Sequence, residues 1–530
     1  MKLVLRVGLI VSAVLSLTGG SVALAAACGD TAGKKGREAP CRCGDTVVTD
    51  TVLGRNDPIT KKACPADGLT VMAGKTLDLN RRVISGVGLG VGIKTAGDAT
   101  VRNGTVQKFE TGTMVDRGTV VLTDLALDAN FGSGLLIAPA AGETPVVTFG
   151  GPRSSVSDNW STGIVVVDGS ALTITGETAQ ARLPILRNGG IGMEIRGEMI
   201  ATNLSVRESF DTGILVDSDS KVKLVNLDLS DNTGHGIHVR GAPGESNLDD
   251  ATLALDPEDY GFQMVGPDTR VSNNAGDGIH LGDPAQTNDV SAFFDLGIVS
   301  GNTGAGIVME QNAALGQGAD CGASAGYPGC TGASIHGVII HDNGDSGVKL
   351  HTSFLMPRKI GNTFYGLGFT SNKVFHNAIG PGCSAAQTQP QILVSGPPGN
   401  SPAACDTFDG DQAACEGANN PVNQHCYWTG STCLVTWDLR GAQDCDDNTA
   451  NPNQIHSYNT NTDPVGSSEL SVGMYAQQEL NPGTGANVWA DNNSWRTGDE
   501  SQNVDQDASS FIDADTICPA GGILLQCATP

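Results

Sequence analysis

One short phrase recurs along the chain, and its clearest copy is LSDNTGHGIHV at residues 229–239. An Asn precedes a Gly by four positions, and the Gly is followed by an apolar, a variable and an apolar residue. The same offset occurs at Asn130/Gly134, Asn159/Gly163, Asn188/Gly192, Asn232/Gly236, Asn274/Gly278, Asn302/Gly306 and Asn343/Gly347, and with Ser in place of Asn at Ser209/Gly213. Chance predicts roughly 0.3 such matches, so the phrase is an internal repeat.

The physical properties of the phrase predict one coil of a stacked structure. Asn tolerates the left-handed backbone region, so we expect it to turn a corner between short strands, and Gly opens the next strand where a neighbouring backbone comes close. The two apolar residues share one face because strand side chains alternate. Copies lie 29, 29, 21, 23, 42, 28 and 41 residues apart.

A period of 21–29 residues is too short for a βαβ unit but suits one coil of a parallel β-solenoid. The longer gaps are expected to be coils that carry a loop, or pairs of coils of which one copy has decayed. The prediction is therefore an all-β solenoid with an Asn ladder at one corner and an aliphatic column inside. A β-sandwich is the alternative, but it would not keep a fixed Asn-to-Gly offset through eight strands.

The first residues are typical of a signal peptide. Lys2 and Arg6 precede an apolar stretch, 7–17, that is too short to span a bilayer, and small residues follow up to Ala27. Lipid attachment at Cys28 is an alternative, although Ala25 stands where a lipoprotein signal has Leu. We predict a protein without a membrane span that is secreted, extracellular or on the cell surface, with the periplasm as an alternative.

Composition narrows the partners. The 14 Cys form an even set compatible with disulfides in an exported protein. A net charge of −26 argues against nucleic acid and anionic membranes. In residues 28–70, four Cys (28, 41, 43 and 64) are expected to close the open end of the solenoid as disulfides. Metal binding is the alternative, and the Cys-x-Cys spacing is wrong for a zinc knuckle.

Three stretches carry a resemblance to a known family. CRCGDTVV, GLTVMAGKTLDLNRRVISG and VRNGTVQKF resemble the opening of exported right-handed parallel β-helix proteins of the pectate-lyase-like superfamily. The resemblance covers roughly residues 40–380 and implies a right-handed, single-stranded parallel β-helix over 71–382. It implies no particular activity, because this fold hosts many functions.

The C-terminal third differs in composition. Residues 383–445 are predicted to be a Cys-rich insertion, because CDTFDGDQAACEGANNPVNQHCYWTGSTC resembles a small plexin-type disulfide knot. Residues 446–530 are predicted to form the last coils and a C-terminal cap. NVDQDASSFIDAD has the acidic alternation of a calcium loop but lacks Gly at the sixth and Glu at the twelfth position. No cofactor or metal ligand is therefore predicted, with Ca²⁺ as the alternative.

Outward-facing positions of the coils are the candidate functional residues. Polar side chains gather there on successive coils from residue 194 to 351, where an acid/base group or a cation could act on a sugar. The candidate catalytic residues are His238, Arg240 and His280. The candidate substrate-binding residues are Glu194, Arg196, Asp217, Glu310, Lys349 and His351. The alternative is a solvated sheet face that is polar by default. Two loops, 241–264 and 311–334, are expected to leave the helix.

No complete catalytic signature is present in the sequence. The TGHGIH stretch resembles the Gly-His-Gly of polygalacturonases, but its companion motifs are not in register, and Asp283-Pro284 is followed by Ala285 rather than by the His-Asp of alginate epimerases. Three functions remain open. The sequence favours a protein that binds glycans or cell-surface proteins, with a polysaccharide lyase, epimerase or hydrolase and a purely structural solenoid as alternatives.

Overall fold

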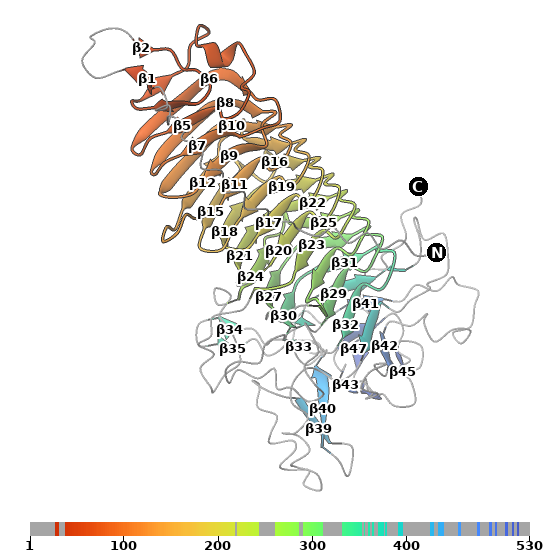
Figure 1. Ribbon diagram of the computed structural model, residues 1–530. Coiled ribbons are helices and arrows are strands. Elements are labelled where there is room, and N and C mark those ends of the chain that lie inside the picture. The colour runs from red at the N-terminus through yellow and green to blue at the C-terminus, as the bar shows by residue number, and fades with distance from the viewer. Residues whose placement is uncertain are drawn as a thin grey trace, which may run out of the picture.

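The fold is a parallel β-helix, seen in a computed structural model (Figure 1). The structure describes residues 27–30, 38–217, 220–242, 260–285, 290–310 and 331–351, and shorter segments, mostly strands, from 354 to 518. Within these residues the strands pair in parallel from coil to coil, and the one helical element is a 3₁₀ turn, η1 (Pro58–Thr60). No helix among them is long and apolar enough to cross a membrane.

Each regular coil contributes one strand to each of three parallel sheets. The first sheet, which follows the repeat Gly, contains β3 (Asp45–Val47), β5 (Leu69–Val71), β7 (Val91–Thr95), β9 (Thr111–Val115), β11 (Leu135–Ile137), β14 (Ile164–Val166), β17 (Met193–Ile195), β20 (Ile214–Val216), β23 (Ile237–Val239), β26 (Ile279–Leu281), β29 (Ile307–Glu310), β32 (Val348–His351), β38 (Ile392–Ser395), β42 (Met474–Gln477) and β45 (Val504–Gln506).

The second and third sheets form the other two walls. The second contains β4 (Thr51–Val52), β12 (Val146–Gly150), β15 (Ala171–Thr175), β18 (Glu198–Thr202), β21 (Lys221–Val225), β24 (Phe262–Val265), β27 (Val290–Asp295), β30 (Thr331–His336) and β33 (Phe354–Leu355). The third contains β13 (Ser155–Ser157), β16 (Leu183–Leu186), β19 (Leu204–Arg207), β22 (Asp228–Ser230), β25 (Arg270–Ser272), β28 (Ile298–Ser300), β31 (Ile339–His341), β37 (Lys373–Phe375), β41 (Gln454–His456), β44 (Asn493–Trp495) and β47 (Ile517–Cys518). Near the N-terminus the long strands β6 (Lys75–Ser85), β8 (Ala99–Gln107) and β10 (Thr119–Asp128) run through both walls.

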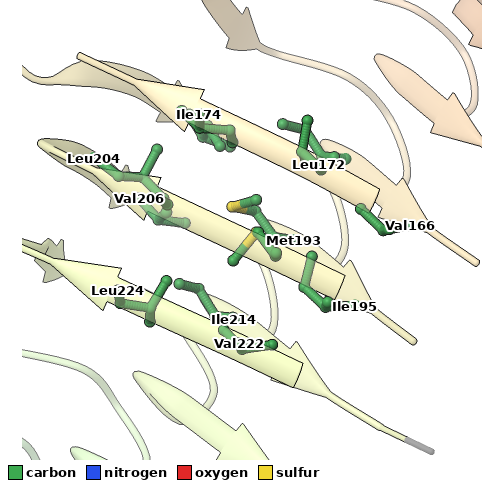
Figure 2. Packing of buried hydrophobic residues seen from close by; sticks show 14 of the residues in the cluster. Val166, Leu172, Ile174, Met193, Ile195, Leu204, Val206, Ile214, Val222 and Leu224 are labelled. Carbon is green, nitrogen blue, oxygen red and sulfur yellow. The ribbon is translucent and has the colours of Figure 1, made fainter. Parts of the chain in front are cut away.

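The interior of the helix is the predicted aliphatic column. Met193, Ile195, Ile214, Leu224 and Val206 come from different sheets and meet inside the coils (Figure 2), each at most 1% exposed. Burying one such side chain stabilises the fold by about 1.5–3 kcal/mol, so this column holds the walls together. The strict alternation of inward apolar and outward residues leaves the outer faces free for other functions.

The Asn ladder is present, and its Asn residues are buried. Asn159 Nδ2 donates to Asn188 Oδ1 at 3.0 Å, and the same pairing joins Asn232 to Asn274 at 2.9 Å. The ladder ends with Asn377, whose Nδ2 donates to Gln391 Oε1 at 2.8 Å. Side-chain amides of neighbouring coils are thus joined along the ladder, except at Ser209, where Asn188 Nδ2 and Ser209 Oγ have no hydrogen-bond partner.

The reason given for Asn at the corner is wrong. The left-handed backbone lies one residue earlier, at Ala129 (φ 51°), Asp158 (φ 56°) and Asp231 (φ 61°), and not at the ladder Asn. What the corner requires of Asn is a side chain that is donor and acceptor at once, because it must satisfy buried backbone and side-chain groups. The selected property is hydrogen bonding rather than backbone tolerance.

The repeat Gly has the role expected of it. A Cβ at Gly163 would lie 2.5 Å from the carbonyl oxygen of Gly192, and a Cβ at Gly236 would lie 2.5 Å from that of Gly278. No side chain fits at that separation, so the close approach of neighbouring backbones at this corner demands Gly.

The N-terminal end is stapled as predicted. Cys28 bonds to Cys41 and Cys43 bonds to Cys64, with Cα–Cα separations of 4.9 and 5.4 Å. The sulfur of Cys28, which a lipid anchor would modify, is thus used in a disulfide. Residues 1–26 of the signal peptide, most of the Cys-rich insertion and the greater part of both loops lie outside the described residues. Of the acidic C-terminal stretch, the structure describes only β45 and β46 (Phe511–Asp513). The domain boundaries stay predictions.

Candidate functional site

Strand pairing stacks the outward residues of the first sheet in one column. His238 of β23 lies in register with Leu215 on one neighbouring strand and with His280 of β26 on the other. His280 is followed in the column by Val308 and then Lys349. Strands β20, β23 and β29 follow one another along the helix in Figure 1. Two candidate catalytic histidines are thereby brought side by side.

A third histidine joins them. The ring centroids of His235, His238 and His280 are separated by 4.8 Å (His235–His280), 4.9 Å (His238–His280) and 5.3 Å (His235–His238). We call these three residues the histidine cluster. On an outer face, an aliphatic residue could fill any packing role of these imidazoles. The ionisable rings therefore distinguish the histidine cluster from the surrounding residues of the sheet.

Two carboxylates flank His280. Nδ1 of His280 lies 2.9 Å from Oδ2 of Asp277, and its Nε2 lies 3.6 Å from Oε2 of Glu310. Burial alone would lower the pKa of His280, but these carboxylates outweigh it and raise that pKa to about 9. His280 is therefore a cation at neutral pH.

The carboxylates respond in the opposite sense. Burial would raise the pKa of Asp277, but the proximity of His235 and His280 and the hydrogen bond from the backbone N–H of Ala305 hold it well below its usual range. The neighbouring His280 lowers the pKa of Glu310, against the effect of burial. Both groups are thus anions at neutral pH and hold the charge on His280 in place.

His238 has different surroundings. Its Nε2 lies 3.2 Å from the carbonyl oxygen of Gly282, and because a carbonyl can only accept, Nε2 donates and the neutral ring keeps its lone pair on Nδ1. Burial, and then the charges on His280 and His235, lower the pKa of His238 to about 4. Two adjacent imidazoles therefore differ in charge, one neutral and one protonated, across the physiological range.

Arg240 is held beside the cluster by acidic residues. Its Nη2 donates to Oδ2 of Asp217 at 2.7 Å, and its Nη1 lies 4.0 Å from Oδ2 of Asp283. The side chain of Arg240 is only 25% exposed. The candidate binding residue Asp217 thus serves to place Arg240, and it partly neutralises the cation.

The other sequence-predicted residues lie apart from the cluster or bind one another. Glu194 and Arg196 pair with each other on β17, two strands before β23. Lys349 donates to Asp345 at 2.6 Å. His351 pairs in register with Glu310, and its charge contributes to the lowered pKa of that carboxyl. The structure therefore gathers His238, Arg240, His280, Asp217 and Glu310 around one point and leaves Glu194, Arg196 and Lys349 outside it.

His235, Asp277 and Asp283 are absent from the sequence-based set. His235 and Asp277 occupy the same repeat position, immediately before Gly236 and Gly278, on adjacent coils. That position lies in the turn rather than in the strand, so a search of outward strand positions passes over it. The available signal was the clustering of ionisable residues at one repeat position, because the corresponding residues of the neighbouring coils are Thr212 and Ala305.

Three of these side chains could hold a metal ion. One ligand atom from each of His235, Asp277 and His280 lies within 4.8 Å of the others, and two imidazoles with a carboxylate suit a divalent transition metal. In the arrangement seen, however, Nδ1 of His235 accepts the backbone N–H of Asp277 at 3.1 Å and lies 3.3 Å from its Oδ2. The first contact uses the lone pair that a metal would need, so a metal would require the ring to turn or to bind through Nε2.

The geometry and the sequence define the class of protein. Residues 148–315 match the family described as right handed beta helix region, and the three parallel sheets fit the pectate-lyase-like fold. The chain is a right-handed parallel β-helix protein with a disulfide-stapled N-terminal end. No curated protein sequence matches it significantly.

Two solved structures resemble the chain. One is the mannuronan C-5 epimerase AlgE4 A-module of Azotobacter vinelandii, with 13% identity and a TM-score of 0.37 over 86% of this chain and 91% of that chain. The other is the AlgE6 A-module of the same organism, with 11% identity and a TM-score of 0.31 over 88% of each chain. At these identities the likeness concerns the fold alone.

Proposed function

We propose that the protein is an extracellular carbohydrate-active enzyme that moves protons to and from a bound polysaccharide at the His238–His280 pair. The observation that supports it is the contact of two imidazoles, 4.9 Å apart on adjacent strands, of which one faces a backbone carbonyl and the other two carboxylates. The sequence alone favours a binding protein, and the convergence of these side chains shifts the balance to an enzyme.

The two histidines suit opposite roles. His238, neutral with its lone pair on Nδ1, is the general base that accepts a proton from a sugar hydroxyl, a ring carbon or a water. His280 is the general acid, and its Nε2 can turn to the substrate because 3.6 Å to Glu310 is longer than a normal hydrogen bond. His238 gains one proton and His280 loses one, so the total charge of the pair is unchanged, and proton exchange with solvent restores the starting protonation states.

The charge around the site bears on the substrate. Asp217, Asp277, Asp283 and Glu310 surround two cations, and Arg240 is already paired with Asp217. A polyuronate would meet these carboxylates and a net charge of −26, so the surroundings favour uncharged sugars. Disulfides in the described N-terminal cap are compatible with an extracellular location.

The test is a screen of the purified protein against neutral and uronic-acid polysaccharides. Reducing ends report hydrolysis, absorbance of unsaturated ends reports a lyase, and deuterium uptake at C5 reports an epimerase. His238→Ala should lower the rate at least 100-fold, in keeping with general acid–base catalysis. The matched control is His336→Ala, because His336 pairs with Asp295 on the second sheet and should leave the rate unchanged.

The same assay separates proton transfer from metal catalysis. Activity should survive EDTA. Activity that disappears with EDTA and returns with Zn²⁺ or Mn²⁺ would replace this mechanism with one in which His235, Asp277 and His280 bind the metal. Full activity of the His238→Ala variant would refute the site.

A further inference from the structure

Three aromatic side chains are exposed on the outer surface of the helix, whereas other aromatic residues of the chain are buried. Phe131, Trp160 and Phe210 are 42%, 68% and 69% exposed, and within the described residues they are the aromatic members of the exposed large hydrophobic group. Aromatic residues make up only 5% of the chain, and Tyr260 and Phe149 are fully buried. Packing does not explain this exposure, and clustered exposed apolar residues mark interaction sites.

The three residues occupy one repeat position, directly after a ladder residue. The backbone N–H of Trp160 donates to the carbonyl of Asn130 at 2.8 Å, and that of Phe210 donates to the carbonyl of Asn188 at 2.9 Å. The three residues therefore lie at the same corner, Trp160 one coil after Phe131 and Phe210 two coils after Trp160. We call Phe131, Trp160 and Phe210 the aromatic column.

The column has one residue on each coil that contributes to it. The rings of Phe131 and Trp160 have centroids 4.6 Å apart at an interplanar angle of 46°. The next coil has Gly189, where a Cβ would lie 2.4 Å from the carbonyl oxygen of Trp160, and the coil after it has Phe210. A single file of rings along the helix axis matches a linear polymer better than the broad patch that a protein partner requires.

The column leads to the histidine cluster. On the coil after Phe210 the same position is Thr233, whose N–H donates to the carbonyl of Ser209 at 3.0 Å, and His235 follows two residues later. Because coils rise by about 4.8 Å, Phe210 precedes His235 by one such step along the helix axis, and His235 lies two residues further around the coil. The column and the cluster thus share one edge of the first sheet.

Polar groups border the column. Asp158, two residues before Trp160, and Arg187, two residues before Gly189 on the next coil, form a two-hydrogen-bond pair with both distances 2.8 Å. Both side chains are more than two-fifths exposed, at 42% and 48%. A sugar ring has apolar C–H faces and a rim of hydroxyls, so rings beside an exposed polar pair complement both parts of it.

We infer that the aromatic column binds the polysaccharide chain on the N-terminal side of the histidine cluster, by stacking successive sugar rings on Phe131, Trp160 and Phe210. This inference rests on the proposed function, because it takes the polymer acted on by the cluster as the ligand. The column would supply affinity for a long chain, and the cluster would act on the bond or ring that lies one coil beyond Phe210.

The experiment measures binding without catalysis. Native gels containing alginate, polygalacturonate, xylan or β-glucan retard a protein that binds the polymer, and the dissociation constant follows from the dependence on polymer concentration. Trp160→Ala should weaken binding roughly three- to tenfold, the range for an aromatic contact, and Trp160→Phe should restore most of it. The matched control is Ile200→Ala, because Ile200 is 52% exposed on the second sheet.

The outcomes separate the two proposals. Weaker binding by Trp160→Ala with unaltered activity of His238→Ala would support the column and refute the catalytic role of His238. Loss of activity in His238→Ala with unaltered binding by Trp160→Ala would support the catalytic role of His238 and refute the column. A change in self-association, seen by light scattering, without a change in retardation would overturn the column as a glycan site, as would wild-type protein that none of the four polymers retards.

Discussion

His238 and His280 are identical residues in register on neighbouring strands, yet their surroundings give them different charges. Burial and the positive charge of His280 disfavour the protonated form of His238 more than the carbonyl of Gly282 favours it, whereas Asp277 and Glu310 favour that form in His280. The difference arises from residues three positions upstream and one strand further on. Chemistry at this site is therefore set by neighbours rather than by the histidines themselves.

The pH dependence of activity should show this difference. The proposed mechanism needs His238 neutral and His280 protonated, so activity should fall below about pH 4 and above about pH 9. Glu310→Gln removes one of the two carboxylates that raise the pKa of His280, so the basic limb should move to lower pH while the acidic limb stays. Histidine NMR titration measures both pKa values directly, and Glu198→Gln on β18 is the control.

Stability should follow the same carboxylates. The pKa of His280 is raised above its unfolded value of about 6.5, so its contribution is complete below that pH and is lost as pH rises through about 9. The free energy of unfolding of the wild type, measured with denaturant, should decline between about pH 6.5 and about pH 9. In Glu310→Gln this decline should be smaller. A basic limb unmoved by Glu310→Gln would mean that another group raises the pKa.

Among the elements, the Asn ladder shows both the reach and the limit of sequence reasoning. The repeat phrase was enough to predict the ladder, the close Gly contacts and the parallel strands, because each follows from one residue type at a fixed offset. The histidine cluster was only half predictable, since His235 and Asp277 lie in turns, where sequence offsets do not reveal side-chain direction. Asp283 lies beyond the strand and is brought to Arg240 only by folding.

The ladder has one break, at Ser209. Both Nδ2 of Asn188 and Oγ of Ser209 are buried without a hydrogen-bond partner, while the rungs on either side are joined. Ser209→Asn should bridge the gap, and because an unsatisfied buried group costs about 1–3 kcal/mol, the free energy of unfolding should rise by about that amount. Chemical denaturation measures the change.

A second variant tests the ladder from the other side. Asn232→Ser would open a new break where Asn232 now bonds Asn274, and it should destabilise the protein by a similar amount. If Ser209→Asn is neutral or destabilising while Asn232→Ser is harmful, the corner at residue 209 lacks room for an amide, and the break is a packing requirement.

The whole molecule is a stack in which each coil contacts mainly its neighbours, so its stability is local. The disulfides lie at the N-terminal end, where the first coils have a neighbour on one side only. They stabilise the end coils, while the coils around the histidine cluster depend on their own core and ladder. A loss of stability at one end of the stack should therefore not extend to the other coils.

Removal of the Cys43–Cys64 disulfide tests this. The Cys43→Ser/Cys64→Ser variant should lose about 2–4 kcal/mol of local stability. Hydrogen exchange should speed up in β3, β5 and β7 but not in β23 and β26. The double variant Cys28→Ser/Cys41→Ser provides the comparison at the same end. Faster exchange throughout the stack would show that the protein unfolds as one cooperative unit instead.

The constant rise of the coils sets a regular spacing of side chains along the helix axis. This spacing separates the coils that carry Phe131, Trp160 and Phe210, and His235 lies on the coil after that of Phe210. Gain or loss of a coil between Trp160 and the histidines would lengthen or shorten the bound stretch of polymer by the rise of one coil. The aromatic residues at one end and the histidine cluster at the other would stay intact. Specificity for chain length would then evolve in discrete jumps, through duplication of repeats rather than through gradual reshaping of a pocket.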